Sequence, residues 1–180
     1  MEEADVVIIK ENNLNIRHLE QSDNYLLAKW LSDPSVLEYY EGRDNPFDLE
    51  KVNQKFYHSN DHVQRCILEY SRMPIGYIQF YLVDDKNEYS ANEVIYGMDQ
   101  FIGETEYWNK GIGTLMIRVM VSYLVEKRQA DRIIMDPQVS NERALKCYEK
   151  CGFKKVKILL KHEFHEGKYR DCWLIEFKPP

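Results

Sequence analysis

Two glycines beside a lysine form the first pattern in this chain that could do chemistry. Gly111 and Gly113 follow Lys110 and stand directly before an apolar stretch at helical spacing, in "YWNKGIGTLMIRVM". The first turn of a helix leaves backbone N–H groups unpaired, and the helix dipole adds partial positive charge at the same place. The pattern therefore suits a phosphate-binding turn with Lys110 as a countercharge. A loop-to-helix turn that merely needs flexible backbone would explain the same residues.

Three residues at helical spacing form a second candidate. Asn141, Ala144 and Tyr148 in "NERALKCYEKCGF" are three and four residues apart, so a helix would place them on one face. Core packing of Ala144 and Tyr148, with Asn141 as a helix cap, accounts for them equally well. Neither pattern decides the function by itself.

The composition of the 180 residues favours one globular domain over residues 1–180. Hydrophobic residues make up 44% of the chain and aromatic residues 13%, which is enough for one substantial core. The formal net charge of -6 argues against nucleic acid as a partner, because phosphate backbones need a basic face. An acidic start and the lack of an apolar run of about 18 residues predict a cytoplasmic protein without membrane contact. We expect a monomer or a weak homodimer.

The cysteines and histidines give no metal-binding pattern. The four cysteines show no CxxC pairing, so we expect reduced thiols at Cys66, Cys147, Cys151 and Cys172. The segment "HEFHEG", which begins at His162, lacks the HExxH spacing of a zinc helix. The sequence therefore predicts no metal.

The order of the predicted elements indicates an α+β fold, a mixed and mostly antiparallel sheet flanked by about four helices. A polar loop is expected at residues 84–92, and Ser22 and Asn141 are expected as helix N-caps. Helices are predicted at residues 22–32, 49–58, 111–127 and 143–150. Strands are predicted at residues 6–9, 14–19, 63–70, 74–83, 93–103, 131–136, 153–160 and 169–177.

Together the two patterns resemble the GNAT superfamily of acyl-CoA-dependent N-acyltransferases. A strand ending in "MDQFIG", then x-x-G-x-G-T opening a helix, then N-x-x-A-x-x-x-Y-x-K-x-G-F occur in that family's order and separation. Trp108 departs from the family, which usually has Arg or Gln there, and Lys110 is the expected substitute. The segments "WLSDPSVLEYYEGRD", "PIGYIQFY" and "HEFHEGK" further resemble aminoglycoside 6'-N-acetyltransferases, including the acetyltransferase halves of bifunctional acetyltransferase-phosphotransferase resistance enzymes.

The resemblance implies a reaction and its cofactor. Acetyl-CoA would donate an acetyl group to the 6'-amine of an aminoglycoside antibiotic, by direct attack in a ternary complex. The pantetheine arm would lie along residues 100–102, where this strand diverges from residues 133–135, and the pyrophosphate would bind the amides of residues 111–114. The implied cofactor-binding residues are Gln100, Phe101, Ile102, Lys110, Gly111, Ile112, Gly113, Thr114, Asn141, Ala144 and Tyr148.

Two residues take catalytic roles under this resemblance. Tyr148 is the implied general acid toward the departing thiolate, and a backbone N–H near Phe101 or Ile102 is the implied oxyanion donor. Asp99 is implied as the base, or as the anchor that orients the acceptor ammonium. Both roles stay open, because an ordinary aspartic acid has a pKa of about 3.9 and is a weak base for an amine.

Carboxylates would attract the ammonium groups of the aminoglycoside. The implied substrate-binding residues are Asp99, Asp136, Tyr40, Glu38, Glu41, Glu166 and Asp171. Asp136 could equally cap the turn before Pro137. Two alternatives remain at this stage: a GNAT acetyltransferase for another small amine or a peptide N-terminus, and a CoA-binding module without catalysis.

Overall fold

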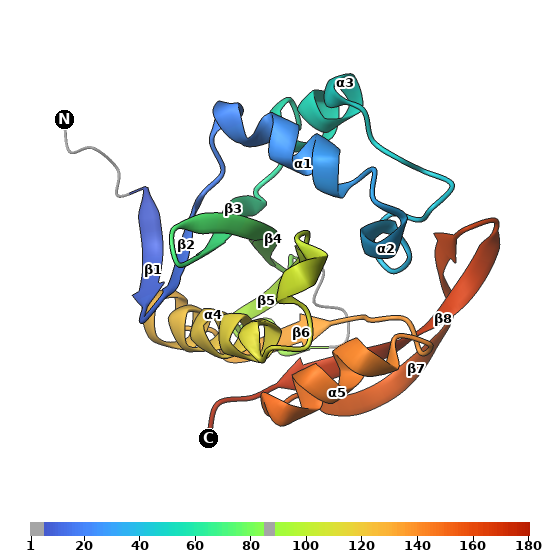
Figure 1. Ribbon diagram of the computed structural model, residues 1–180. Coiled ribbons are helices and arrows are strands. Elements are labelled where there is room, and N and C mark those ends of the chain that lie inside the picture. Colours follow the sequence, from blue (N-terminus) through green and yellow to red (C-terminus); the bar gives the residue numbers. More distant parts are fainter. Residues whose placement is uncertain (1–5, 85–88) are drawn as a thin grey trace. The chain divides into compact units, whose positions relative to one another are not determined.

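The computed structural model describes residues 6–84 and 89–180, which fall into two compact units (Figure 1). Unit 1 comprises the chain up to residue 79 together with residues 100–110, and unit 2 comprises residues 80–99 and 111–180. The predicted single domain over residues 1–180 stays a prediction. The predicted polar loop contains residues 85–88, which lie outside the described residues.

Short strands and helices alternate along the chain. Unit 1 contains β1 (Val7–Glu11), β2 (Leu14–His18), η1 (Gln21–Asp23), α1 (Asn24–Trp30), α2 (Pro34–Leu37), α3 (Leu49–Val52), η2 (Asn53–Tyr57), β3 (Gln64–Tyr70) and η3 (Thr105–Tyr107). Unit 2 contains α4 (Ile112–Arg128), β6 (Arg132–Met135), α5 (Glu142–Lys150), β7 (Lys154–His165) and β8 (Lys168–Phe177). The strand β4 (Met73–Leu82) begins in unit 1 and ends in unit 2, and the strand β5 (Ile95–Ile102) begins in unit 2 and ends in unit 1.

The strands form a mixed sheet in the order β1-β2-β3-β4-β5-β6-β8-β7. The pairs β1–β2, β2–β3, β6–β8 and β7–β8 are antiparallel, whereas β5 and β6 run parallel. This arrangement confirms the predicted α+β class and its mostly antiparallel sheet. Each predicted strand is present, although β7 reaches His165, five residues past its predicted end.

The longest helix, α4, starts where the glycines predict. Gly111 is its N-cap with a left-handed φ of 78°, and the backbone N–H of Leu115 donates to the Gly111 carbonyl at 3.1 Å. Gln129 ends the helix, also in the left-handed region. The buried side chains recur every three or four residues, so one face packs into the core. They are Ile112, Met116, Ile117, Met120, Val121 and Leu124.

The segment after α4 also agrees with the prediction from the sequence. The strand β6 ends at Met135, before Pro137, which cannot donate a backbone hydrogen bond. Asn141 caps α5, because its side chain accepts a hydrogen bond from the backbone N–H of Ala144.

Two-residue turns with positive φ close two of the hairpins. They are Ser71–Arg72 between β3 and β4, and Glu166–Gly167 between β7 and β8.

Two predictions for unit 1 were wrong. Ser22 does not cap a helix. Asp23 is the N-cap of α1, although its side chain makes no cap hydrogen bond to that helix. Its carboxylate instead accepts from the Glu20 backbone N–H, in the capping box of η1, and pairs with Arg17, both at 2.8 Å. The short helix α2 was not predicted, and it begins at Pro34 with the Asp33 side chain accepting from the Ser35 N–H. A helix so short is set by its cap more than by apolar periodicity.

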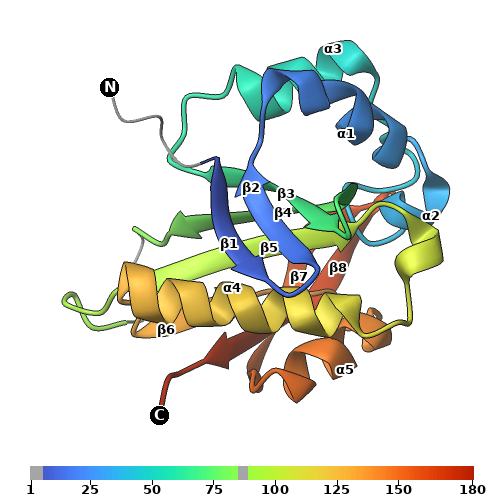
Figure 2. The same ribbon diagram turned by 60° about the vertical axis from the view of Figure 1, so that its left-hand side comes forward.

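The core of unit 1 is aromatic. The helices α1 and α3 contact each other and lie side by side in both ribbon views (Figures 1 and 2). Trp30 from α1 is 1% exposed and packs edge-on against Phe101, which in turn stacks on Tyr77 at 5.5 Å between ring centroids. Gly103 lies under the indole, because an added Cβ would come within 2.2 Å of Trp30 Cγ.

We predict that Gly103→Ala destabilises the protein by about 1–3 kcal/mol, because the new methyl group would force the buried Trp30 ring to move. Chemical denaturation monitored by tryptophan fluorescence measures this change. Thr105→Ala, two residues away at an exposed position, is the matched control and should stay within about 0.5 kcal/mol of the parent protein. Equal stabilities of the two variants would contradict the packing described here.

Candidate functional site

The start of α4 offers a group of backbone donors. Helix geometry leaves the N–H groups of Ile112, Gly113 and Thr114 without an acceptor one turn back, and no side chain caps this end. A Cβ built on Gly111 would meet no described atom within 4 Å. Space and unpaired donors at the positive end of a helix suit an anionic group such as a diphosphate. The structure thus keeps the phosphate interpretation of Gly111–Thr114 open, and nothing there blocks it.

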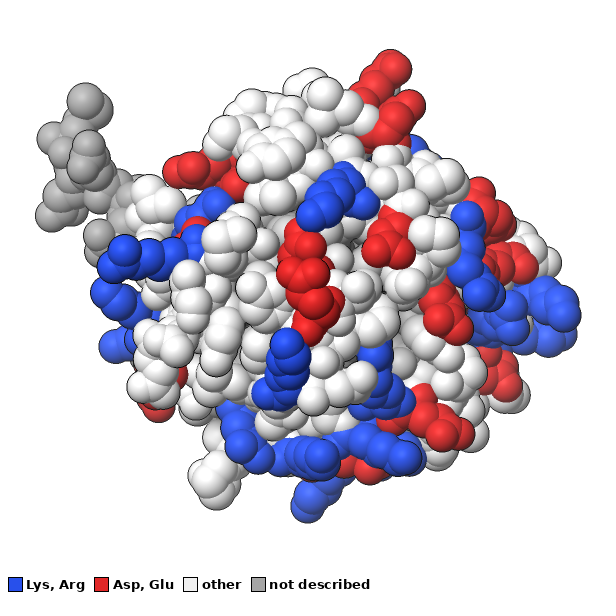
Figure 3. Space-filling view, in the orientation of Figure 1, with Lys and Arg blue, Asp and Glu red and all other residues white. Residues whose placement is uncertain are grey.

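The helix α5 carries the second predicted pattern on one face. Asn141 caps the helix, with 3.4 Å between its Oδ1 and the Ala144 nitrogen, and half-buried Tyr148 lies 6.3 Å from Phe153 between ring centroids. The two helices of unit 2, α4 and α5, contact each other. Figure 3 shows Lys and Arg side chains gathered on the surface over α5, which favours anionic ligands on this side of unit 2.

The parallel pairing of β5 with β6 is short. It joins Ile95 with Arg132 and ends at the pair Gly97–Ile134, although β5 continues to Ile102. This early end agrees with the strand divergence that the resemblance implies. Beyond the pair Gly97–Ile134, β5 continues with Met98 and half-buried Asp99, which lie beside the end of β6.

Asp99 and Asp136 stand at the same level of these two strands. Each lies two residues beyond the last pair, Gly97–Ile134. Paired residues of parallel strands point to one side of the sheet and side chains alternate with a period of two. The backbone therefore directs both carboxylates toward the side that Gly97 and Ile134 occupy.

A tyrosine covers that side of the sheet. The ring of Tyr81 lies over Gly97, where an added Cβ would come within 2.7 Å of the phenolic oxygen. Burial raises the pKa of Tyr81 well above its usual range, and the charges of Asp99 and Asp136 raise it further. Both carboxylates thus act on one phenol, which shows that the structure brings these two predicted residues together. No sequence pattern marks Tyr81, because the place of its ring depends on a glycine sixteen residues later.

A histidine from β7 binds the second carboxylate. His162 Nε2 lies 2.7 Å from Asp136 Oδ2, and the two side chains are 40% and 46% exposed. No backbone N–H donates to Asp136 within the described ranges, so the turn-capping alternative for this residue has no hydrogen bond to support it. Sequence reasoning considered His162 for zinc alone and missed this pairing.

Two further predicted carboxylates help to hold the β7–β8 hairpin. Asp171 Oδ1 accepts from the backbone N–H of Lys161 at 2.9 Å, where β7 has an irregular register and Lys161 has a positive φ. Glu166 occupies the two-residue turn, with its Oε1 3.8 Å from Nε2 of buried His165. These contacts give Glu166 and Asp171 structural tasks, and their predicted role in substrate binding stays a prediction.

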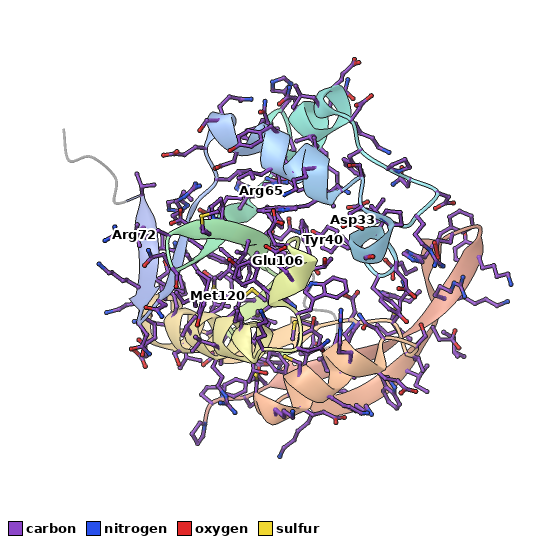
Figure 4. The ribbon with its side chains drawn as sticks, viewed as in Figure 1. Asp33, Tyr40, Arg65, Arg72, Glu106 and Met120 are labelled. Carbon is purple, nitrogen blue, oxygen red and sulfur yellow. The ribbon has the colours of Figure 1, made fainter. Side chains whose placement is uncertain are left out.

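In unit 1 the segment after α2 brings one predicted residue onto β5. The Tyr40 ring, labelled in Figure 4, packs edge-on against Phe101 at 4.6 Å between centroids. Glu41 has a positive φ and its carboxylate pairs with Lys55. Lys55 therefore compensates much of the charge that Glu41 would offer to a cation. Glu38 is exposed at the end of α2.

The departure from the family at Trp108 has a structural explanation. The Trp108 indole N–H donates to the carbonyl of Ile102 at 2.9 Å, and the ring packs on the core of unit 1. Trp108 thereby ties the end of η3 to the end of β5. The exposed Lys110 ammonium lies 5.8 Å from the Tyr107 ring centroid.

Two cysteines lie beside the first turn of α4. Cys147 Sγ is 3.4 Å from Thr114 Oγ1, and Cys151 Sγ is 3.6 Å from the Thr114 carbonyl oxygen. A hydrogen bond from Cys151 lowers the pKa of the Cys147 thiol to about 6. Thr114 and the positive charges of Lys150 and Arg118 act in the same direction, whereas burial opposes them. The pKa of Cys151 is raised in turn, so Cys147 carries the thiolate of this pair.

We predict that iodoacetamide alkylates Cys147 before the three buried cysteines of the native protein. Thiolate is the reactive form, so the rate should rise as the pH passes through about 6 and then level off. Peptide mass spectrometry over a pH series measures it, and Cys147→Ser is the control that should abolish the fast phase. A rate that climbs up to about pH 8.5, as for an ordinary cysteine, would contradict the lowered pKa.

Among residues 6–84 and 89–180, no three side chains of His, Cys, Asp or Glu gather in a way that could hold a metal ion. His162 and His165 are three apart on a strand, so they point to opposite sides of the sheet. Within the same ranges, no helix has the length and apolar character that a bilayer crossing requires.

Comparison with known proteins identifies the class of this fold and site. A family model described as "Acetyltransferase (GNAT) domain" matches residues 20–160, most of the chain. The protein is therefore an acetyltransferase by class. It belongs to the GNAT family, as its two sequence patterns predicted.

Its relatives include enzymes of antibiotic resistance. The chain is 28% identical to the aminoglycoside N(6')-acetyltransferase type 1 of Klebsiella pneumoniae, over 83% of this chain and 78% of the relative. A solved structure of AAC(6')-Ib in complex with ribostamycin and coenzyme A has a TM-score of 0.78 at 24% identity, covering 92% of this chain and 93% of that one. Spermidine N-acetyltransferase from Vibrio cholerae, solved with CoA and spermine, has a TM-score of 0.77 at 19% identity, covering 93% and 96%.

Proposed function

We propose that this protein is an aminoglycoside 6'-N-acetyltransferase, which moves the acetyl group of acetyl-CoA to the 6'-amine of aminoglycoside antibiotics and so confers resistance. The observation that carries this proposal is the placement of Asp99 and Asp136 at one level beyond the last β5–β6 pair, both acting on Tyr81. Two neighbouring carboxylates suit a substrate with several ammonium groups. The relative from Klebsiella pneumoniae supports the same substrate class.

Acetyl-CoA is the cofactor of the family and supplies an activated acetyl thioester. The residues present fit it, because α4 begins with unpaired amides, no capping side chain and open space at Gly111. We propose that Ile112, Gly113 and Thr114 bind its diphosphate. The backbone of residues 100–102 would bind its pantetheine arm, Lys110 would add positive charge, and the Asn141–Tyr148 face of α5 would line the same ligand.

Asp99 prepares the acceptor in this proposal. It lies just past the point where β5 leaves β6, so its carboxylate can receive a primary ammonium and orient the amine for attack. The carboxylate accepts the released proton either directly or through water, which is the choice the sequence left open.

Tyr148 assists the leaving group. Its phenol is half-buried on α5, on the same face as Asn141 and Ala144. As a general acid it would donate its proton to the thiolate that departs from the collapsing tetrahedral adduct. A backbone N–H near Phe101 or Ile102 would stabilise the developing oxyanion.

A linear polyamine is the second candidate substrate. Paired carboxylates also suit spermidine-like cations, and one structural neighbour is a spermidine N-acetyltransferase. A panel of amines assayed with acetyl-CoA separates this candidate, peptide N-termini and a CoA-binding module without catalysis from the proposed substrate. For location and assembly we propose the bacterial cytoplasm and a monomer or weak homodimer.

The test of the proposed function is acetylation of the drug itself. We expect kanamycin or tobramycin to gain one acetyl group with acetyl-CoA, seen by mass spectrometry, and NMR to locate it on the 6'-nitrogen. Asp99→Asn should lower kcat/KM for the drug by about 100-fold or more with the CoA Kd nearly unchanged. Asp44→Asn, at an exposed position, is the control. Acetylation of spermidine but of no aminoglycoside would overturn the substrate assignment.

A second variant tests the leaving-group role. Tyr148→Phe removes the proton donor and keeps the ring, so kcat should fall by about 10- to 100-fold while both KM values stay within about twofold. Steady-state and single-turnover kinetics measure these changes. Tyr169→Phe, at a 64% exposed site, is the matched control. If Tyr148→Phe weakens CoA binding and leaves the chemical step unchanged, Tyr148 packs against the cofactor and does not act as an acid.

A further inference from the structure

His162 belongs to the acceptor side of unit 2, although no sequence pattern marks it. Its Nε2 lies 2.7 Å from Asp136 Oδ2, and both side chains are partly exposed. No lysine or arginine pairs with Asp136 in the described part of the chain, and no hydrogen bond reaches its other oxygen, Oδ1. One carboxylate oxygen is therefore held by the imidazole while the second remains available to a ligand.

The chemical nature of this partner matters. An ammonium or guanidinium would hold the carboxylate and cancel its charge, as Lys55 does for Glu41. An imidazole can donate its Nε2–H while it carries no charge. Unlike an ammonium, an imidazole can thus order a carboxylate such as Asp136 without cancelling the negative charge that a cationic ligand needs.

The surroundings keep the local charge negative. Besides Asp99 and Tyr81, the groups that act on this region are Glu163, Asp171 and buried Cys172. Burial and then the charges of Glu163, Asp136 and Asp171 raise the pKa of Cys172 to about 12. The Cys172 thiol therefore stays neutral, and the three carboxylates around it attract cations.

The two candidate ammonium sites lie near one another. Each carboxylate is two residues beyond the last β5–β6 pair, and at that pair the strands are about 5 Å apart. One amine of an acceptor can bind Asp99 for acetylation while another amine of the same molecule binds Asp136. A substrate with a single amine can use the first site alone.

We propose that His162 is a positioning residue that holds Asp136 as a second ammonium-binding carboxylate, and that it thereby selects acceptors with at least two amines. The inference rests on the proposed function and goes beyond it, since it assigns the choice among amines to the pair of Asp136, just after β6, and His162 of β7. His162 itself does not touch the reacting atoms.

The test compares a polyamine with a monoamine in the full-length protein. Tobramycin carries several amines, and methyl 6-amino-6-deoxyglucoside carries one. His162→Ala should raise KM for tobramycin by about 5- to 10-fold with kcat nearly unchanged, because it removes one positioning hydrogen bond. Neither the KM for the monoamine nor the KM for acetyl-CoA should change. His162→Gln, which keeps an N–H donor at similar reach, should recover most of the loss.

A double variant isolates the pair. Asp136→Asn alone should raise KM for tobramycin, and adding His162→Ala should raise it little further, because both act through one carboxylate. An unchanged tobramycin KM in His162→Ala would overturn this inference and leave the proposed function standing. Equal losses for both acceptors with a lowered thermal midpoint would mean a structural role and would also overturn it. A parent protein that acetylates no aminoglycoside would instead refute the proposed function.

Discussion

The pairing of β5 with β6 ends after three residues, and the candidate chemistry of unit 2 depends on that early end. Up to Gly97 and Ile134 the backbone groups of the two strands satisfy each other. Beyond that pair the backbone of β5 no longer pairs with β6, and the strand still presents Met98 and Asp99 beside the end of β6. Pro137 has no N–H to continue the ladder, which helps to explain why the strands separate there. Where the parallel pairing ends, the backbone of β5 can pair with a ligand, and the two carboxylates beside it can attract a cation.

Glycine makes this arrangement possible in unit 2, as it does in the core of unit 1. At Gly97 the missing side chain leaves room for the Tyr81 ring, whose phenol then lies within the influence of Asp99 and Asp136. At Gly103 the missing side chain leaves room for Trp30, which packs against Phe101. A methyl group at either position would collide with an aromatic ring, so these glycines are set by packing and not by an unusual φ.

Much of this fold could be predicted because its signals are local. The left-handed cap at Gly111, the apolar stripe of α4 and the Asn141 cap all depend on residues within a turn of one another. For the site, resemblance supplied candidate residues such as Asp99 and Asp136, whose roles stay predictions. Tyr81 and His162 could not be predicted, because their positions depend on strand register between segments 16 and 26 residues apart. The N-cap at Asp23 was missed because the short helix η1, which contains Ser22, directly precedes α1.

The contrast between Glu41 and Asp136 bears on how the chain would distinguish its ligands. Both carboxylates were predicted to bind substrate from the same kind of pattern. Glu41 pairs with the permanent positive charge of Lys55, and a substrate ammonium would have to displace that lysine to gain a full ion pair. Asp136 pairs with an imidazole, a group that can hold a carboxylate by a hydrogen bond without a permanent positive charge. Acidic composition alone would rank the two equally. The partner of each carboxylate, and not its own identity, therefore decides which of them can recognise a cation.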